Sequence, residues 1–249
     1  MIYNIYKPVE WTSFDVVKKV RIITKEKKVG HAGTLDPFAE GILIIGTGKD
    51  TKVLSSISNN SKTYKAKLIL GSATDTMDNK GKIIESKVVP RLEMAKVNSV
   101  INSFAGDYKH YPPMYSAKKV NGVRLYKLAR ENKIVKRNPI LSNISDISLN
   151  DFKETEVSFS VSCSKGTYIR VLGCDIAKKL GTAGYLDQLI RTKVGTYNIS
   201  DAIKINDFEM FSNTRTTACD STCEAVSDFS LVDSITYSPP FPAELPGCY

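Results

Sequence analysis

The spacing of hydrophobic residues along the chain predicts several β-strands. Residues 62–70 (K-T-Y-K-A-K-L-I-L) alternate lysine with Tyr64 and apolar side chains, and residues 156–163 alternate serine with apolar side chains. This two-residue period is typical of strands that have one buried and one exposed face. Residues 2–6 and 134–150 have weaker strand patterns, whereas the short apolar run 42–45 predicts a buried strand.

Other stretches have the three-to-four-residue spacing of amphipathic helices. A helix is predicted from a cap at Thr12 or Ser13 to about residue 25, with Phe14, Val17 and Val20 on one face. Further helices are predicted at 91–104, 124–131 and 167–180, a short helix after Asp50, and a helical turn followed by a strand within 185–197. Strands and helices mixed in this order predict an α+β fold.

Charge is distributed unevenly along the 249 residues. The formal net charge is +9, but residues 211–249 contain one arginine and five acids. Residues 1–210 therefore contain 34 basic and 21 acidic side chains, a net charge of +13. Such a basic body favours a polyanionic partner such as nucleic acid, although solvated lysine-rich faces are the alternative.

Composition excludes several other classes of protein. No apolar run approaches the roughly 20 residues of a membrane-spanning helix, and no signal peptide is evident, so a cytoplasmic protein is expected. The five cysteines form no C-x-x-C pair, which argues against a zinc site or a disulfide framework. Residues 211–249 lack strand rhythm and contain S-P-P-F-P, so we predict an atypical acidic tail, either disordered or a truncated remnant, after a domain that spans 1–210.

The loop G-H-A-G-T-L-D (30–36) is the strongest candidate for a site. Gly30 and Gly33 allow unusual backbone angles, and Asp36 precedes a proline, which disfavours a helical backbone at that position. An Asp-Pro pair is more often a simple turn. The functional interpretation needs a basic partner that keeps the carboxylate ionised, and Arg170 in the first turn of the predicted 167–180 helix is suitable.

Aromatic side chains near lysines suggest contacts with nucleic acid. Tyr64 lies among Lys62, Lys65 and Lys67, where an aromatic ring could stack on a base while lysines meet phosphates. A core aromatic on a half-buried strand explains the same pattern, and Tyr168 has the same ambiguity.

Five ordered motifs resemble the TruB family of tRNA pseudouridine synthases. They are K-P-V-E-W-T-S (7–13), G-H-A-G-T-L-D-P-F-A-E-G-I-L-I-I-G-T-G-K-D-T-K (30–52), K-T-Y-x5-L-G-x2-T-D-T-x-D-x2-G (62–81), P-P-M-Y-S-A-K-K-V-N-G-V-R-L-Y-K-L-A-R (112–130) and S-K-G-T-Y-I-R-V-L (164–172). The resemblance covers about residues 1–205. It implies a pseudouridine-synthase-type catalytic domain, with a mixed, mostly antiparallel central sheet flanked by helices and loops.

The resemblance also implies an activity and site residues. The family isomerises uridine 55 in the T loop of tRNA without a metal or other cofactor. Asp36 would be the nucleophile, attacking C1′ or C6 of a flipped uridine, Arg170 its partner, and Tyr64 the residue that stacks on the base and takes part in proton transfer. Tyr168, His31, Gly30, Gly33, Lys7 and Lys62 would contact the RNA or line the pocket. A monomer that needs no protein partner is expected.

Three departures from the family pattern accompany the resemblance. Glu10 stands where the family opening usually has glycine, Ile190 replaces the first arginine of L-R-R-T, and residues 211–249 are too short for the RNA-binding domain that follows in full-length bacterial members. Two alternative functions stay open. The basic body and the atypical tail motivate a tRNA-binding folding aid with weak or no catalysis. The other is guide-dependent modification of ribosomal RNA, as in the dyskerin branch, and the short length counts against it.

Overall fold

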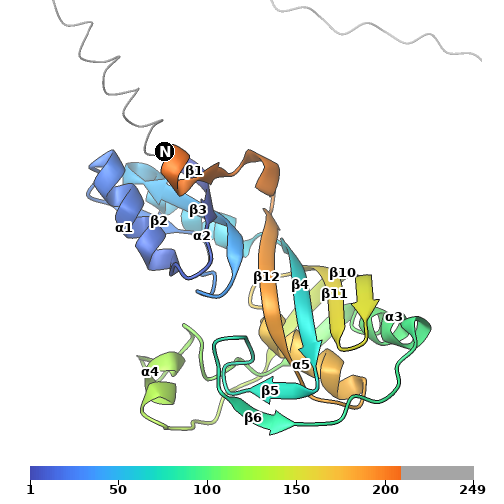
Figure 1. The fold of residues 1–249 in the computed structure, drawn as a ribbon. Coiled ribbons are helices and arrows are strands. Elements are labelled where there is room, and N and C mark those ends of the chain that lie inside the picture. Colours follow the sequence, from blue (N-terminus) through green and yellow to red (C-terminus); the bar gives the residue numbers. More distant parts are fainter. Residues whose placement is uncertain (209–249) are drawn as a thin grey trace, which may run out of the picture. The chain divides into compact units, whose positions relative to one another are not determined.

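The computed structural model describes residues 1–208 and shows an α+β fold with a ten-stranded sheet (Figure 1). The strands of this sheet are β1 (Ile2–Lys7), β2 (Val29–His31), β3 (Glu40–Thr47), β4 (Lys62–Leu70), β7 (Gly106–His110), β10 (Ile140–Lys153), β11 (Glu156–Cys163), β12 (Gly184–Val194), β13 (Tyr197–Asn198) and β14 (Ile203–Lys204). Two separate hairpins pair β5 (Ser72–Thr74) with β6 (Ile83–Ser86), and β8 (Lys119–Val120) with β9 (Val123–Arg124). The helices are α1 (Ser13–Thr24), α2 (Leu54–Asn59), α3 (Met94–Asn102), α4 (Leu125–Arg130) and α5 (Ile169–Lys179), with 3-10 turns at Gly48–Lys52 and Ile199–Asp201.

The sheet is mostly antiparallel, as predicted, with the strand order β14-β1-β3-β12-β4-β11-β10-β7. Strand β12 pairs with β4 along most of its length, but it meets β3 only where Ile190 and Arg191 lie opposite Glu40 and Gly41. This short contact joins a first half of the sheet (β1, β2, β3 and β14) to a second half (β4, β7, β10 and β11), as Figure 1 shows. Gly41 has a φ of +104°, and a Cβ there would lie 2.3 Å from the Arg191 carbonyl oxygen. The junction therefore requires glycine.

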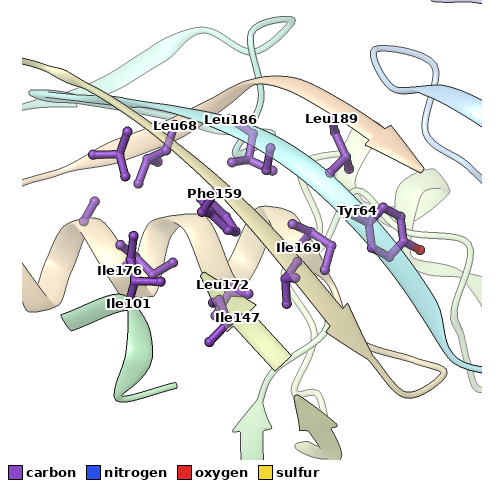
Figure 2. Packing of buried hydrophobic residues seen from close by; sticks show 14 of the residues in the cluster. Tyr64, Leu68, Ile101, Ile147, Phe159, Ile169, Leu172, Ile176, Leu186 and Leu189 are labelled. Carbon is purple, nitrogen blue, oxygen red and sulfur yellow. The ribbon is translucent and has the colours of Figure 1, made fainter. Parts of the chain in front are cut away.

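The larger hydrophobic core lies between the second half of the sheet and helices α3 and α5 (Figure 2). Phe159 of β11 is fully buried in this core, together with Leu172 of α5 and Ile101 of α3. Burial of each such side chain contributes roughly 1.5–3 kcal/mol, so the core holds β4 and α5 in a fixed relation. Tyr64 and Leu189 lie at one end, and the Tyr64 hydroxyl points away from the cluster (Figure 2).

Helix α1 begins at the predicted cap. The Thr12 hydroxyl accepts a hydrogen bond from the Asp15 amide at 3.1 Å, and the Asp15 carboxylate accepts one from the Thr12 amide at 2.8 Å. This reciprocal capping box satisfies two main-chain donors at the start of the helix. The cap therefore sets where the helix starts against β1 and β3.

The buried face of α1 differs from the prediction at one residue. Val16, Val17 and Val20 are buried, but Phe14 is 64% exposed. Steps of three residues, as from 14 to 17 to 20, drift around a helix of 3.6 residues per turn. The stripe that faces the first half of the sheet instead follows 13, 16, 17 and 20, the spacing of a single helical face.

The helical turn predicted within 185–197 was wrong, because Gly184–Val194 is a continuous strand. Its pairing with β4 shifts register between Leu186 and Gln188 and again between Arg191 and Lys193. These bulges interrupt the two-residue alternation and place buried leucines three residues apart, which imitates helical spacing. Strand β10 also begins later than predicted, and β2 and β6 are additional short strands.

The predicted boundary at residue 210 and the predicted acidic tail 211–249 lie outside the described residues. None of the helices in residues 1–208 has the length and hydrophobicity needed to cross a membrane.

Candidate active site

Asp36 lies on a loop between β2 and β3 whose main chain is held by several hydrogen bonds. The buried Ser13 hydroxyl accepts from the Leu35 amide at 2.8 Å and donates to the Leu35 carbonyl at 3.0 Å. The Ala39 amide donates to the Asp36 carbonyl at 3.1 Å, and Gly33 has a φ of +85°. The carboxylate of Asp36 therefore projects from a fixed backbone, in agreement with the prediction that Asp36 occupies an extended or turn conformation.

Two buried cations also hold this loop. Arg191 is 1% exposed, and its guanidinium donates to the carbonyl oxygens of Ile42 at 2.7 Å, Gly33 at 3.2 Å and Thr34 at 3.4 Å. On the other flank, the Lys7 ammonium donates to the carbonyls of Pro8, Trp11 and Pro37. Burial lowers the pKa of Lys7 to about 8.

Glu10, one of the departures noted in the sequence, adopts a backbone conformation that favours glycine. Its φ is +70°, in the left-handed region, and its amide donates to the Pro37 carbonyl at 2.8 Å. A turn that supports the Asp36 loop therefore forms with glutamate at this position. The Glu10 carboxylate forms an exposed ion pair with Lys80.

The strain at position 10 gives a testable expectation. We expect Glu10→Gly to be more stable to unfolding than Glu10→Ala by about 1 kcal/mol, because only glycine occupies this backbone region without steric cost. Both variants lose the Lys80 ion pair, so the difference between their free energies of unfolding reports the cost of the backbone conformation at position 10. Urea denaturation measures it, and equal stability of the two variants would contradict a strained turn.

The structure brings Arg170 to Asp36, as predicted. Arg170 is 3% exposed, and its Nε donates to Asp36 Oδ2 at 2.8 Å, while the Asp36 side chain is 33% exposed. The remaining guanidinium nitrogens donate to the carbonyl oxygens of Thr76 at 2.7 Å and Tyr115 at 2.8 Å. The arginine thus orients a carboxylate that stays accessible on one side.

Asp78 is a site residue that the sequence reasoning missed. Its Oδ2 lies 3.6 Å from Arg170 Nη1, and its Oδ1 accepts from the Thr76 hydroxyl at 2.6 Å and the Lys80 amide at 3.0 Å. Burial raises the pKa of Asp78, and the Thr76 hydroxyl and the Arg170 charge oppose that rise. Asp78 lies within the quoted T-D-T-M-D motif, which was the available signal.

A cavity of about 600 Å³ opens beside this cluster. Asp36, Arg170, Tyr64, Tyr168, Gly33 and Lys62 all line it, so six of the predicted site residues meet there. Arg191 and Lys165 also line it, which makes the wall cationic. Burial, with help from the Arg191 charge, lowers the pKa of Lys62 to about 8. Such a hollow suits a ligand that has a flat ring and negative charge.

Tyr64 combines a core position with a place on the cavity wall, and the half-buried Tyr168 lines the same cavity. Tyr64 is 8% exposed, belongs to the larger core and lies opposite Arg191 across the β4–β12 pairing. Burial raises the pKa of Tyr64 and also that of Tyr168. Both interpretations of the sequence pattern thus apply to Tyr64, which is a core aromatic residue and also faces the cavity.

Lys7, Gly30 and His31 lie near the loop but do not line this cavity. Gly30 is in β2, where a Cβ would come within 3.1 Å of Leu54, so its lack of a side chain serves packing. His31 is also in β2, and its Nδ1 is buried without a hydrogen-bond partner in the part of the chain that the structure describes. Burial lowers the pKa of His31.

Stability should fall in mild acid because of the two histidines. Burial lowers the pKa of both His31 and His110 below the ordinary 6.5, so the unfolded chain binds protons before the folded one does. The free energy of unfolding is therefore expected to decrease as pH falls through 6.5. Urea denaturation at pH 7.5 and 5.5 measures this, and a double variant, His31→Asn with His110→Gln, should have a smaller decrease. An unchanged decrease would contradict it.

Within residues 1–208, no group of three or more His, Cys, Asp or Glu side chains is arranged to hold a metal ion. Cys163 and Cys174 are free thiols, and burial raises the pKa of Cys163 to about 11.

Comparison with known proteins identifies the family. The sequence profile of the TruB family pseudouridylate synthase (N terminal domain) matches residues 21–169. The chain is 45% identical over 206 residues to tRNA pseudouridine synthase B of Clostridium tetani, covering 83% of this chain and 71% of that protein. It is 46% identical over 207 residues to the protein of the same name from Thermosipho melanesiensis, covering 83% and 67%.

A solved structure agrees with the sequence comparisons. A chain from the crystal structure of a Cbf5-Nop10-Gar1 complex superposes with a TM-score of 0.70 and 25% identity, over 88% of this chain and 56% of that one. The resemblance inferred from the five motifs and the predicted fold class are thus confirmed. The chain belongs to the TruB family of pseudouridylate synthases.

Proposed function

We propose that this protein isomerises uridine to pseudouridine at position 55 in the T loop of tRNA. The observation that carries the proposal is the half-accessible Asp36 carboxylate, fixed at 2.8 Å by a buried Arg170 on the wall of a cavity that Tyr64 and Tyr168 also line. The relatives at 45–46% identity are named tRNA pseudouridine synthase B, which supports tRNA as the substrate.

Asp36 acts as the nucleophile in this proposal. Arg170 Nε engages Oδ2, so Oδ1 is the oxygen that we assign to attack on the flipped uridine. In attack at C1′, the bond from Oδ1 forms as the bond between C1′ and the base nitrogen breaks; in attack at C6, the bond from Oδ1 forms first and the bond between C1′ and the base nitrogen then breaks. In either case the base turns within the cavity, C5 bonds to C1′, and the bond to Oδ1 breaks, which restores the Asp36 carboxylate. The C5 proton is released to solvent.

The cavity wall supplies binding of the flipped base. Flipping costs a few kcal/mol, and stacking on an aromatic ring returns roughly 1–3 kcal/mol. Burial raises the pKa of Tyr64, so its phenol stays protonated near neutral pH. This favours stacking over proton acceptance as the role of Tyr64. In this proposal Lys62 and Lys165, which line the same wall, contact phosphate oxygens.

Release of tritium from uridine C5 tests the proposed function. Wild-type protein incubated with a T-arm RNA labelled at uridine C5 should release label to water. A matched RNA in which cytidine replaces the uridine at position 55 should release none. Equal release from both RNAs would contradict the assigned position, and no release from either would contradict the activity.

The same assay separates the two alternatives. Tight RNA binding without release from wild-type protein would favour the folding aid. Release that requires an added guide RNA would favour modification of ribosomal RNA, the less favoured alternative because the relatives at 45–46% identity are named for tRNA. A monomer that acts in the cytoplasm without a protein partner stays a prediction from the sequence.

A further inference from the structure

His110, at the end of β7, lies in an aromatic stack that leads to the cavity. Its buried ring lies parallel to that of Tyr108, with centroids 4.7 Å apart and planes 8° apart. Its other side meets the Tyr168 ring edge-on at 5.9 Å. The Tyr108 hydroxyl donates to Asp175 of α5 at 2.5 Å, so the stack is tied to that helix.

One ring nitrogen of His110 faces two main-chain groups, of which one is a hydrogen-bond acceptor and the other a donor. Nε2 lies 3.3 Å from the Gly166 carbonyl oxygen, which requires a donor, and 3.4 Å from the Tyr168 amide, which requires an acceptor. A neutral imidazole with a bare Nε2 can accept from Tyr168, whereas a protonated Nε2 can only donate to Gly166. Whether Nε2 carries a hydrogen therefore selects which group it holds: the neutral Nδ1–H tautomer holds the Tyr168 amide, whereas the imidazolium and the neutral Nε2–H tautomer hold the Gly166 carbonyl.

These two main-chain groups belong to the cavity wall. Gly166 and Tyr168 both line the cavity, and Tyr168 is the cap residue of α5, two positions before Arg170. A hydrogen bond to the Tyr168 amide thus fixes the point from which Arg170 reaches Asp36. Release of this amide would let the first turn of α5 shift relative to β7.

The charges around His110 favour its neutral form near pH 7. Burial lowers the pKa of His110, and Lys118 acts in the same direction, whereas Asp175 and the carbonyls of Tyr108 and Gly166 oppose the shift. A positive ring would also lie at the N-terminal end of α5, where the helix dipole disfavours cations. The phenols of Tyr108 and Tyr168, whose pKa values burial raises, stay uncharged.

We propose that His110 is a positioning residue for the isomerisation, which in its neutral Nδ1–H tautomer holds the Tyr168 amide and thereby the start of the helix that carries Arg170. The proposal rests on the proposed function. His110 does not line the cavity, so its effect is transmitted through Tyr168 and Arg170 rather than by contact with the RNA. The step that it serves is catalysis, and substrate affinity should change little.

Two substitutions separate positioning from simple packing. In His110→Gln, the amide oxygen can accept from Tyr168 while the amide nitrogen donates to Gly166, and the side chain does not titrate. In His110→Leu, both hydrogen bonds are lost. We expect His110→Leu to lower kcat for tritium release by roughly three- to tenfold with KM changed less than twofold, and His110→Gln to keep the wild-type kcat at pH 7.5.

The pH profile gives a readout that packing alone would not alter. Wild-type kcat should fall as pH decreases from 7 to 5.5, and the kcat of His110→Gln should fall less over the same range. Lys109→Gln, on the same strand with an exposed side chain, is the matched control and should follow wild type. If His110→Leu does not fold, the pH profiles of wild type and His110→Gln still test whether His110 has a positioning role.

The outcomes are distinguishable from failure of the proposed function. Two results with an active wild type would overturn the positioning role alone. One is a kcat of His110→Gln that falls between pH 7 and 5.5 as much as the wild-type kcat does. The other is a decrease in kcat at pH 7.5 that is as large in His110→Gln as in His110→Leu. Wild type without release from T-arm RNA would overturn the proposed function and this role with it.

Discussion

Asp36→Asn protein is expected to release tritium from T-arm RNA at least about 10³-fold more slowly than wild type, because an amide cannot form the covalent bond that the proposed reaction needs. The amide keeps the size of the side chain, and its oxygen can still accept from Arg170 Nε. The cavity should therefore keep its shape, and RNA affinity measured by filter binding should change little. Single-turnover release with excess protein measures the chemical step.

Asp36→Ala is the companion variant, because it excludes slow conversion of asparagine back to aspartate. Asp207→Asn is the matched control: it removes an exposed carboxylate outside the cavity and should leave release unchanged. Release from Asp36→Ala within tenfold of wild type would contradict the assignment of the nucleophile. Loss of RNA binding in both Asp36 variants would instead show that the carboxylate supports the fold of the site.

Arg170→Lys should have the second-largest effect, a decrease in kcat of about 100-fold. Lysine keeps the positive charge, but its single ammonium cannot match the planar fork that engages Asp36, Thr76 and Tyr115 at 2.7–2.8 Å. A displacement of about 1 Å in a reacting group can cost roughly 10² in rate. Single-turnover tritium release again provides the measurement, with KM expected to change far less than kcat.

Arg124→Lys is a matched control at an exposed position and should keep wild-type activity. Circular dichroism and urea denaturation establish whether Arg170→Lys stays folded, since its partners Asp36 and Asp78 would otherwise be left near each other with weaker compensation. A folded Arg170→Lys protein with wild-type kcat would contradict the need for the guanidinium.

The elements best predicted from the sequence are those with a complete local signal. Residues 62–70 and 156–163 follow the two-residue period without interruption, and both strands have the predicted bounds. The cap at Thr12 is equally local. Because of its two bulges, the sequence of β12 has a spacing of buried residues that resembles a helical turn. The exposure of Phe14 depends on which face of α1 packs on the sheet. Register and facing depend on partners distant in sequence, which short-range periodicity does not encode.

The pairing of Asp36 with Arg170 was predictable because each residue had a local reason to be a candidate. For Asp78 the available signal was its place in the T-D-T-x-D motif, but neither Asp78 nor Arg191 stood out by residue pattern, since a single acid in a polar turn or a single arginine on a strand is usually solvated. Their importance comes from burial against main-chain carbonyls and against Arg170, which only the assembled fold creates. The hydrogen bonds from Lys7 to the carbonyls of Pro8, Trp11 and Pro37 likewise could not be predicted from the spacing of residues.

The short contact between β12 and β3 has a consequence for how the protein is made. Asp36 and Arg170 lie 134 residues apart, and the strand that joins their halves of the sheet is completed only when residues 190–191 are in place. A chain that emerges from the ribosome at about 5–20 residues per second therefore exposes Asp36 for roughly 10–30 seconds before β12 can close the sheet. During synthesis Asp36 therefore exists long before the cavity that it lines, and the candidate site is among the last features to form.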